Sequence, residues 1–230
     1  MRAPFVNRMS RTQTALGWCY LPVHIVVLPV LLGLYASVSP DLGVVGVNLI
    51  YYGAGFAFAL TVMFRFLRAG FDAMLDRPGR CVLAAVLALA AEYAMCMLAA
   101  LLTLALLSAA ANPNSAAALD FAEQNYGAIK ALGLFIGPIV EETLFRGVVF
   151  GSLRGKSRVL AYLVSTLLFG LYHVWQYALA YADTALLLYA LQYVPISLAL
   201  DWCYERTESV WPPVFVHMIL NAASLAAMRL

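Results

Sequence analysis

The stretch ALGWCYLPVHIVVLPVLLGLYASV (residues 15–38) contains no Asp, Glu, Lys or Arg. A helix of about 20 apolar residues is long enough to cross a bilayer. A secretory signal peptide has a shorter apolar core, of about 7–15 residues, and ends in a small-residue cleavage site. No clear A-x-A site follows the stretch, so it predicts a first transmembrane helix that is retained in the protein.

The rest of the chain repeats this apolar pattern. The composition is 64% hydrophobic and only 11% charged, with a mean hydropathy of +0.85, whereas soluble domains are about 25% charged. We therefore expect an all-α, polytopic transmembrane helix bundle that forms a single membrane domain over residues 1–230. The seven expected spans are residues 15–37, 44–64, 81–109, 131–153, 159–180, 184–203 and 210–228.

Two polar connectors interrupt the apolar segments. The first, RFLRAGFDAMLDRPGRC (residues 65–81), predicts a short amphipathic segment. The second, NPNSAAALDFAEQNYGA (residues 112–128), opens with an Asn-Pro pair that breaks a helix. After this break, Ser115 to Tyr126 predicts a helix on the surface.

Basic residues predict the orientation in the membrane, because loops rich in Lys and Arg stay in the cytoplasm. With seven spans, one side receives only Lys130 and Arg229. We therefore expect an integral protein of a bacterial inner membrane with a cytoplasmic N-terminus. The side expected to be cytoplasmic receives Arg2, Arg8, Arg11, Arg65, Arg68, Arg77, Arg80, Arg154, Lys156, Arg158 and Arg206.

Charge and cysteine usage exclude two classes of function. The net charge is only +2 and the basic residues form no stripe with interleaved aromatics, so we expect no nucleic-acid partner. The four cysteines lie far apart without a C-x-x-C pair. We interpret them as apolar helix residues rather than a disulfide or zinc framework.

Polar side chains inside the expected spans are informative about function, because burying a charge in a membrane costs several kcal/mol. Some have a purely structural interpretation. His24 is expected to hydrogen-bond a neighbouring helix, and Glu92 is expected to be a structural acid near Tyr93 or a partner helix. The set consists of His24, Glu92, Glu141, Glu142, Arg146, His173, His217 and the amide Asn221.

The segment GPIVEETLFRG (residues 137–147) places two acids and a base in one apolar helix. Glu142 and Arg146 are four residues apart, so they share a helix face and can form an ion pair that is structural. Glu141 is turned about 100° away from Glu142. We therefore expect Glu142 to be neutralised within its own helix and Glu141 to face another group.

Two downstream segments supply candidates for that group. FGLYH places Phe169 and His173 one turn apart, and HMILN does the same for His217 and Asn221. At about 1.5 Å of rise per residue, Glu141, the two histidines and Asn221 lie about 10–22 Å from the expected cytoplasmic ends. These depths are compatible with one polar cluster in mid-membrane.

The motifs EETLFR, FGLYH and HMILN, in this order on successive apolar segments, resemble those of the CPBP family. This family contains CAAX proteases and bacteriocin-processing enzymes, is also called the Abi family, and includes the Ras-converting CAAX prenyl endopeptidase of the endoplasmic reticulum. The resemblance covers about residues 131–225, the expected catalytic core. The N-terminal spans, within residues 1–110, show no family signature.

The resemblance implies an intramembrane glutamic endopeptidase. In this family pattern Glu141 is the general base that activates water, and His173 holds or polarises that water. His217 and Asn221 complete the cavity, with Asn221 as a candidate oxyanion donor. The supporting residues are Glu142, Arg146 and Phe169.

The chemistry is consistent with these roles, since peptide hydrolysis needs a base for water and donors for the developing oxyanion. A zinc-dependent metalloprotease with Glu141, His173 and His217 as ligands is the alternative. There is no H-E-x-x-H helix, and the three ligands come from three spans. We therefore expect no metal and no cofactor.

Two other classes of function stay open. A proton-coupled transporter would distribute polar residues along a path through the membrane, and a non-catalytic immunity or scaffold protein could retain the motifs. We expect the partners to be the lipid bilayer and a protein or peptide substrate in or at the membrane. A prenylated CAAX protein, a bacteriocin leader and a C-terminal sorting signal all fit the same site.

Overall fold

The computed structural model describes residues 5–107, 112–124, 127 and 130–227. These ranges form helices and turns without any strand, which confirms the all-α prediction. The α-helices are α1 (Arg11–Pro22), α2 (Leu28–Val38), α3 (Gly43–Thr61), α4 (Phe64–Asp76), α5 (Pro78–Leu107), α6 (Pro113–Gln124), α8 (Gly137–Glu142), α9 (Gly151–Arg154), α10 (Arg158–Ala180), α11 (Val194–Thr207) and α12 (Trp211–Ala227). Between them lie the π-helical segments Val23–Val27, Lys130–Ile136 and Thr143–Phe150 and the 3₁₀ segments Pro40–Leu42 and Thr184–Tyr193.

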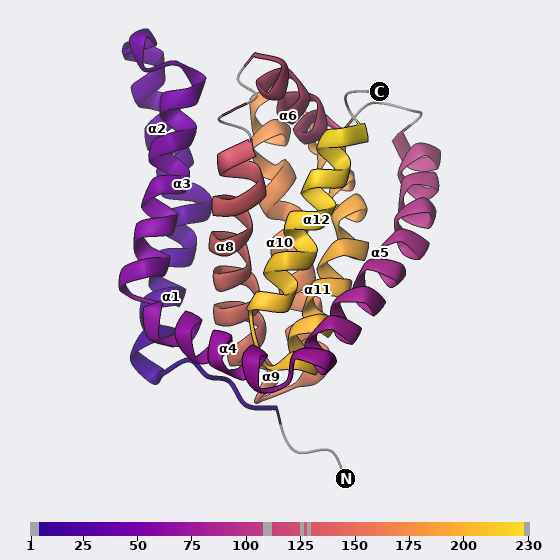
Figure 1. Ribbon diagram of the computed structural model, residues 1–230. Coiled ribbons are helices and arrows are strands. Elements are labelled where there is room, and N and C mark those ends of the chain that lie inside the picture. Colours follow the sequence, from indigo (N-terminus) through magenta and orange to yellow (C-terminus); the bar gives the residue numbers. More distant parts are fainter. Residues whose placement is uncertain (1–4, 108–111, 125–126, 128–129, 228–230) are drawn as a thin grey trace.

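The helices form a bundle with α8, α10, α11 and α12 in its middle (Figure 1). The N-terminal pair, α1 continued by α2 and then α3, stands on one side, and α5 stands on the other. Helix α4 crosses one end of the bundle and α6 lies at the opposite end. The three motifs EETLFR, FGLYH and HMILN therefore lie on central helices that the N-terminal pair and α5 flank.

Five helical segments are long and apolar enough to cross a membrane: Arg11–Val38, Gly43–Thr61, Pro78–Leu107, Arg158–Ala180 and Thr184–Thr207. The expected count of seven is not confirmed. The helix that runs from Lys130 to Arg154 carries Glu141, Glu142 and Arg146 and does not qualify, because these charges interrupt its apolar sequence. Trp211–Ala227 is apolar but has only 17 residues.

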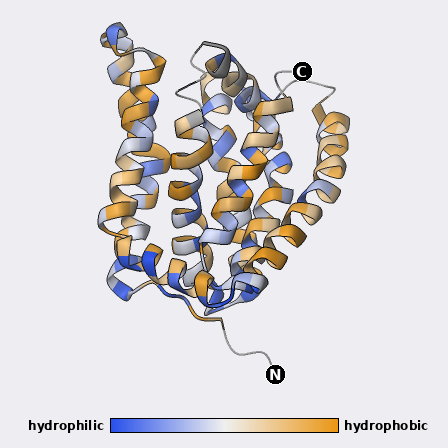
Figure 2. Cartoon of the chain, in the orientation of Figure 1, coloured by the Kyte–Doolittle hydropathy of each residue, from blue (hydrophilic) through white to orange (hydrophobic). Residues whose placement is uncertain are grey.

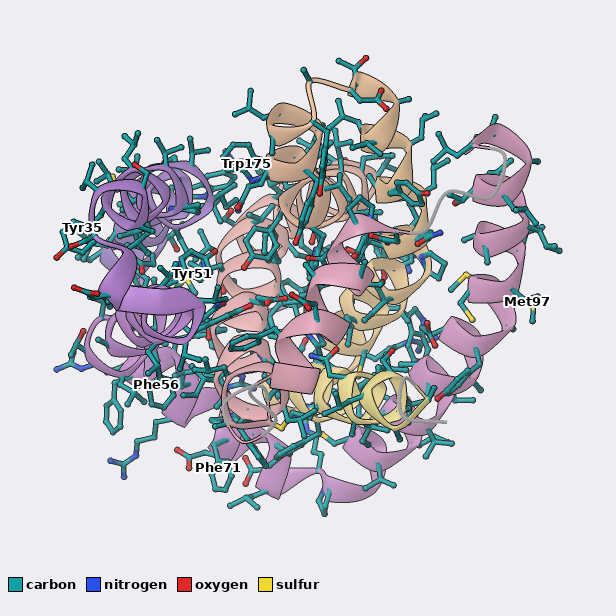
Figure 3. All side chains as sticks on the ribbon, turned by 90° about the horizontal axis from the view of Figure 1, so that it is seen from above. Tyr35, Tyr51, Phe56, Phe71, Met97 and Trp175 are labelled. Atoms are coloured by element: carbon teal, nitrogen blue, oxygen red, sulfur yellow. The ribbon has the colours of Figure 1, made fainter. Side chains whose placement is uncertain are left out.

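The outer surface of the bundle is apolar, as expected for contact with lipid (Figure 2). On α5, Met97 is 65% exposed and Leu98 is 70% exposed, and Figure 3 shows Met97 pointing away from the bundle. Hydrophilic residues instead gather at the end that holds α4 and α9. The protein is therefore an integral membrane protein.

Both polar connectors contain a helix, α4 in the first and α6 in the second. In α4, Phe66 and Leu67 are buried while Arg65 and Arg68 are exposed, which confirms an amphipathic connector. Helix α6 covers the predicted Ser115–Tyr126 helix up to Gln124, and Tyr126 lies outside the described residues.

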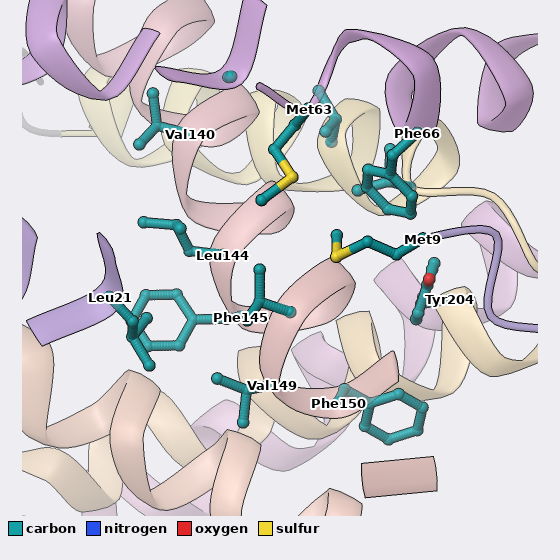
Figure 4. Close-up of a cluster of buried hydrophobic side chains, with 14 of the residues drawn as sticks. Met9, Leu21, Met63, Phe66, Val140, Leu144, Phe145, Val149, Phe150 and Tyr204 are labelled. Carbon is teal, nitrogen blue, oxygen red and sulfur yellow. The ribbon is translucent and has the colours of Figure 1, made fainter. Parts of the chain in front are cut away.

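The core surrounds the helix that carries the two glutamates (Figure 4). Every residue from Val140 to Gly151 is buried, and Val140, Leu144, Phe145 and Val149 pack into one hydrophobic cluster with Met9, Leu21, Met63 and Phe66. Since this cluster joins residues from both halves of the chain, the N-terminal helices hold the central helix in place.

Candidate active site

The helix from Lys130 to Arg154 departs twice from regular α-helical geometry. Residues Lys130–Ile136 and Thr143–Phe150 are π-helical, and the α-helical turn Gly137–Glu142 between them carries both glutamates. π-Helical segments are rare and occur frequently at functional sites. The acidic pair Glu141 and Glu142 therefore lies between two π-helical segments.

Glu141 lies beside both downstream histidines. Its Oε2 atom is 3.8 Å from Nε2 of His173 and 3.9 Å from Nε2 of His217. The carboxylate side chain is 8% exposed, and Oε2 has no hydrogen-bond partner. Three side chains from three separate helices therefore converge on one buried point.

Hydrogen bonds on the far side of each ring fix how the histidines face Glu141. Nδ1 of His173 lies 2.7 Å from the carbonyl oxygen of Phe169, and Nδ1 of His217 lies 2.8 Å from Oε1 of Glu142. A carbonyl or an ionised carboxylate only accepts hydrogen bonds, so each Nδ1 donates. In a neutral histidine Nε2 is then a lone-pair acceptor, and both Nε2 atoms face Glu141.

Arg146 is completely buried in a polar network behind the histidines. It pairs with Glu142 at 3.2 Å and with Asp201 at 3.3 Å. One guanidinium nitrogen also donates to the carbonyl and hydroxyl oxygens of Ser197, at 3.1 and 3.0 Å. The guanidinium carbon lies 4.4 Å from the centre of the Phe169 ring, a cation–π distance. The two glutamates therefore differ in environment: Glu142 is ion-paired with Arg146, and Glu141 is not.

Asn221 is one turn beyond His217 and lines the same cavity as Glu141. Its Nδ2 atom donates to the carbonyl oxygen of Gly133 at 2.8 Å. This bond ties α12 to the start of the glutamate-bearing helix and uses one of the two amide N–H groups. The second N–H is the donor that the amide has left for a ligand.

The site opens into a cavity of about 560 Å³, within the size range of small-ligand and peptide pockets. The central helices, the N-terminal pair and α6 all contribute to it. The residues that line the cavity are Pro29, Leu32, Gly33, Val47, Asn48, Tyr51, Tyr52, Asn114, Ser115, Ala118, Gly133, Leu134, Gly137, Glu141, Phe169, Tyr172, His173, Gln176, Tyr177, Tyr193, Ile196, His217, Asn221, Ser224 and Leu225.

Tyr193 connects α6 to the site. Its ring stacks on the ring of His173, with the centres 4.2 Å apart and the planes 17° apart. Its hydroxyl accepts hydrogen bonds from Asn114 at 2.9 Å and from Asn112 at 3.4 Å. Tyr193 therefore contacts one histidine of the site with its ring and the surface helix with its hydroxyl.

Sequence reasoning missed Asp201 and Tyr193. Asp201 carries a detectable signal, since it is an acid inside the predicted span 184–203. Tyr193 carries none, because aromatic residues are common throughout the chain and a ring stack between helices depends on tertiary packing.

The structural interpretation of His24 is wrong in its detail. His24 is fully buried, but neither ring nitrogen has a hydrogen-bond partner. The ring stacks on Tyr51, with the centres 4.5 Å apart, and Figure 3 shows Tyr51 between the N-terminal helices and the central ones. Glu92 lies on α5, where its Oε2 atom is also buried without a partner.

Glu141, His173 and His217 are also the ligands of the alternative hypothesis, a zinc-dependent metalloprotease. Among the residues that the structure describes, no group of three His, Cys, Asp or Glu side chains is arranged to hold a metal ion. A tetrahedral zinc with Zn–N bonds of about 2.0–2.1 Å holds neighbouring ligand atoms about 3.3–3.4 Å apart. The separations of 3.8 and 3.9 Å around Glu141 are wider than this tetrahedral spacing.

Comparisons with known proteins support a relation to membrane peptidases. Residues 124–223 match a family model described as type II CAAX prenyl endopeptidase Rce1-like. The chain is 34% identical over 87 residues to "Putative membrane peptidase YdiL" of Bacillus subtilis (strain 168), which covers 37% of this chain and 31% of that protein. It is 31% identical over 99 residues to "UPF0177 protein YxdF" of Lactococcus lactis subsp. lactis (strain IL1403), covering 43% and 49% respectively.

The chain thus spans about a third of one curated relative and about half of the other. No solved structure matches. All three motifs quoted above, EETLFR, FGLYH and HMILN, fall inside residues 124–223. The match confirms the resemblance to the CPBP family, and residues 124–223 form an Rce1-like segment.

Proposed function

We propose that this protein is an intramembrane endopeptidase that hydrolyses a peptide bond with a water molecule activated by Glu141. The observation that carries the proposal is the meeting of the Glu141 carboxylate and two histidine Nε2 atoms at a cavity inside the bundle. The similarity to a family of CAAX endopeptidases supports the same reaction class. Both relatives are bacterial, which supports a place in a bacterial inner membrane.

The Glu141 carboxylate and the two histidine Nε2 atoms can together bind a water molecule. The carboxylate and two neutral Nε2 atoms are all acceptors, and a water that donates to two of them presents a lone pair to a substrate carbonyl. As the water oxygen bonds to the carbonyl carbon, Glu141 takes its proton. Glu141 then delivers that proton to the leaving amine as the carbon–nitrogen bond breaks.

Negative charge develops on the substrate's carbonyl oxygen during the reaction and needs a hydrogen-bond donor in the cavity. The free amide N–H of Asn221 is that donor. Glu142 acts through His217, because its carboxylate accepts the Nδ1 proton and holds that ring with Nε2 toward the site. Arg146 pairs with Glu142 and is held in place by Asp201 and Ser197. Each supporting residue thus has a stated partner.

The direct test compares membranes of the native host that carry wild-type protein, Glu141→Gln, or Glu92→Gln. Glu92 is a matched control, because it is also an intramembrane acid but lies on α5, away from the cavity. We expect uncut substrate proteins to accumulate with Glu141→Gln and not with Glu92→Gln, as measured by mass spectrometry of new peptide termini. Identical termini in all three strains would refute the protease proposal.

The purified protein tests the role of metal. We propose a reaction without metal, so strong chelators should leave the cleavage rate unchanged, and elemental analysis should find far less than one zinc per chain. His173→Ala should still abolish cleavage, because the water loses an acceptor. Stoichiometric zinc that is lost in His173→Ala and His217→Ala, with activity restored when zinc is returned to stripped wild type, would establish the metalloprotease instead.

A further inference from the structure

The cavity lies in one half of the bundle. Helix α10 begins at Arg158 but lines the cavity only with residues 169–177, and α12 begins at Trp211 but contributes residues 217–225. Helix α3 runs in the opposite direction and contributes residues 47–52, near its start. The residues from α6 complete the lining at the same end, opposite α4 (Figure 1).

The other end of the bundle carries the positive charge. Four segments meet at this end: the start of α1, the connector through α4 to α5, the α9–α10 turn and the end of α11. Figure 2 shows hydrophilic residues concentrated at this end. The basic residues described on these segments are Arg8, Arg11, Arg65, Arg68, Arg77, Arg80, Arg154, Lys156, Arg158 and Arg206.

The end near the cavity has the opposite balance. Among the described residues it carries Asp41 before α3, Asp120 and Glu123 in α6 and Asp183 after α10, with Lys130 as its basic residue. Loops rich in Lys and Arg remain in the cytoplasm. The cavity and α6 therefore face away from the cytoplasm.

The wall of the cavity indicates which kind of peptide fits. Glu141 is the only carboxylate among the described lining residues, and no Lys or Arg is among them. Tyrosines from three segments form much of the wall, and the hydroxyls of Tyr51 and Tyr172 lie 3.0 Å apart. A free C-terminal carboxylate next to the scissile bond would enter this cavity without a cation to balance it, and burying an unpaired charge is costly.

We infer that the active site is reached from the extracytoplasmic side and takes an uncharged, internal stretch of an exported or membrane-anchored protein. This inference rests on the proposed peptidase function for its substrate, but the side of access is a property of the fold. A cytoplasmic C-terminal tail does not fit either condition. The substrate stretch extends from the polar surface near α6 toward Glu141.

Cysteine labelling tests the side of access without any need for activity. Ser115→Cys on α6 and Ser224→Cys on α12 place exposed thiols on the cavity wall, and Asp72→Cys places one on exposed α4 as a control. A membrane-impermeant maleimide, applied to spheroplasts and to inverted vesicles, should label the first two only in spheroplasts and the control only in inverted vesicles. Labelling above the wild-type background is scored, because Cys19 is exposed in the native chain.

Labelling of Ser115→Cys or Ser224→Cys from the cytoplasmic side, or from neither side, would overturn the inference. The substrate class is tested by the cut sites that disappear with Glu141→Gln in the native host. They should lie outside the cytoplasm and lack Lys, Arg, Asp and Glu beside the scissile bond, whereas cytoplasmic or charged sites would refute the inference. Labelling as expected without any lost cut site would instead refute the protease proposal and leave the side of access established.

Discussion

Replacement of the two adjacent glutamates by glutamine should have very different effects on stability. Glu142 is 0% exposed and contributes its charge to Arg146 at 3.2 Å and to His217 at 2.8 Å. Removal of one partner from a buried ion pair costs about 3–5 kcal/mol. Asp201 remains 3.3 Å from Arg146, so we expect the low end of this range, about 3 kcal/mol for Glu142→Gln.

Glu141→Gln removes a charge that has no Lys or Arg partner among the described residues. The neutral amide avoids the cost of burying an unpaired carboxylate, so we expect a change of less than about 1 kcal/mol. For a chain of 150–250 residues, 1 kcal/mol corresponds to about 2–4 °C in Tm. Glu142→Gln should therefore lower Tm by about 6–12 °C, and Glu141→Gln should shift it by less than about 4 °C.

The assay is thermal unfolding of the purified proteins in one detergent at one scan rate, because Tm depends on scan rate when unfolding is irreversible. Asp201→Asn is a matched control, since it neutralises the other acid at Arg146 and leaves the cavity untouched. It should lower Tm about as much as Glu142→Gln. Equal losses of Tm in Glu141→Gln and Glu142→Gln would refute the division of roles between the two acids.

Substitutions at three further positions test individual contacts. Tyr193→Phe keeps the ring stack on His173 but loses the hydrogen bonds to α6, so KM should rise several-fold with little change in kcat. Tyr193→Leu also loses the ring stack, so it should lower kcat as well. Equal kinetics of the two variants would contradict this. Asn221→Ala should lower kcat by a factor of about 10²–10³ as the loss of an oxyanion donor, about 2.7–4 kcal/mol, and an unchanged kcat would exclude that role. Gly55→Ala would place a methyl group 2.7 Å from Val140 and 3.0 Å from His24, so the free energy of unfolding should fall by about 1–3 kcal/mol, and an unchanged Tm would show that the helices separate freely there.

The sequence predicted the features that depend on a single helix, namely its apolar length and the spacing of its charged residues. Apolar length identified the all-α fold, and the four-residue spacing of Glu142 and Arg146 identified their ion pair. The count of seven spans was harder to predict. The helix from Lys130 to Arg154 contains charged residues and α12 is short, so neither meets the length and hydropathy expected of a membrane span. Apolar length and hydropathy identify helices that contact lipid. A helix that is surrounded by other helices does not contact lipid, so it can be shorter or carry charged residues.

Contacts between helices were harder to predict than contacts within one. The separation of Glu141 from Glu142 followed from helical periodicity, but the bond from His217 to Glu142 depends on how α12 packs against α8. Asp201 illustrates the same limit: as an intramembrane acid it signals a partner, yet only the packing of α11 identifies Arg146 as that partner. His24 shows the converse case, since a buried imidazole predicts a hydrogen bond and the structure stacks it on Tyr51 instead.

The charges in the network explain why the chain needs two acids beside one base. Glu141, Glu142 and Asp201 bring three carboxylates to a region with one permanent cation, Arg146. Full ionisation would leave a net charge of −2, which a buried site does not tolerate without compensation, and His173 and His217 are the other groups in the network that can carry positive charge. Arg146 pairs with both Glu142 and Asp201, so it offsets their two negative charges only in part. In the proposed reaction, the proton that Glu141 takes from water neutralises its carboxylate and moves the negative charge to the oxygens of the reacting carbonyl carbon, where the free amide N–H of Asn221 can balance it.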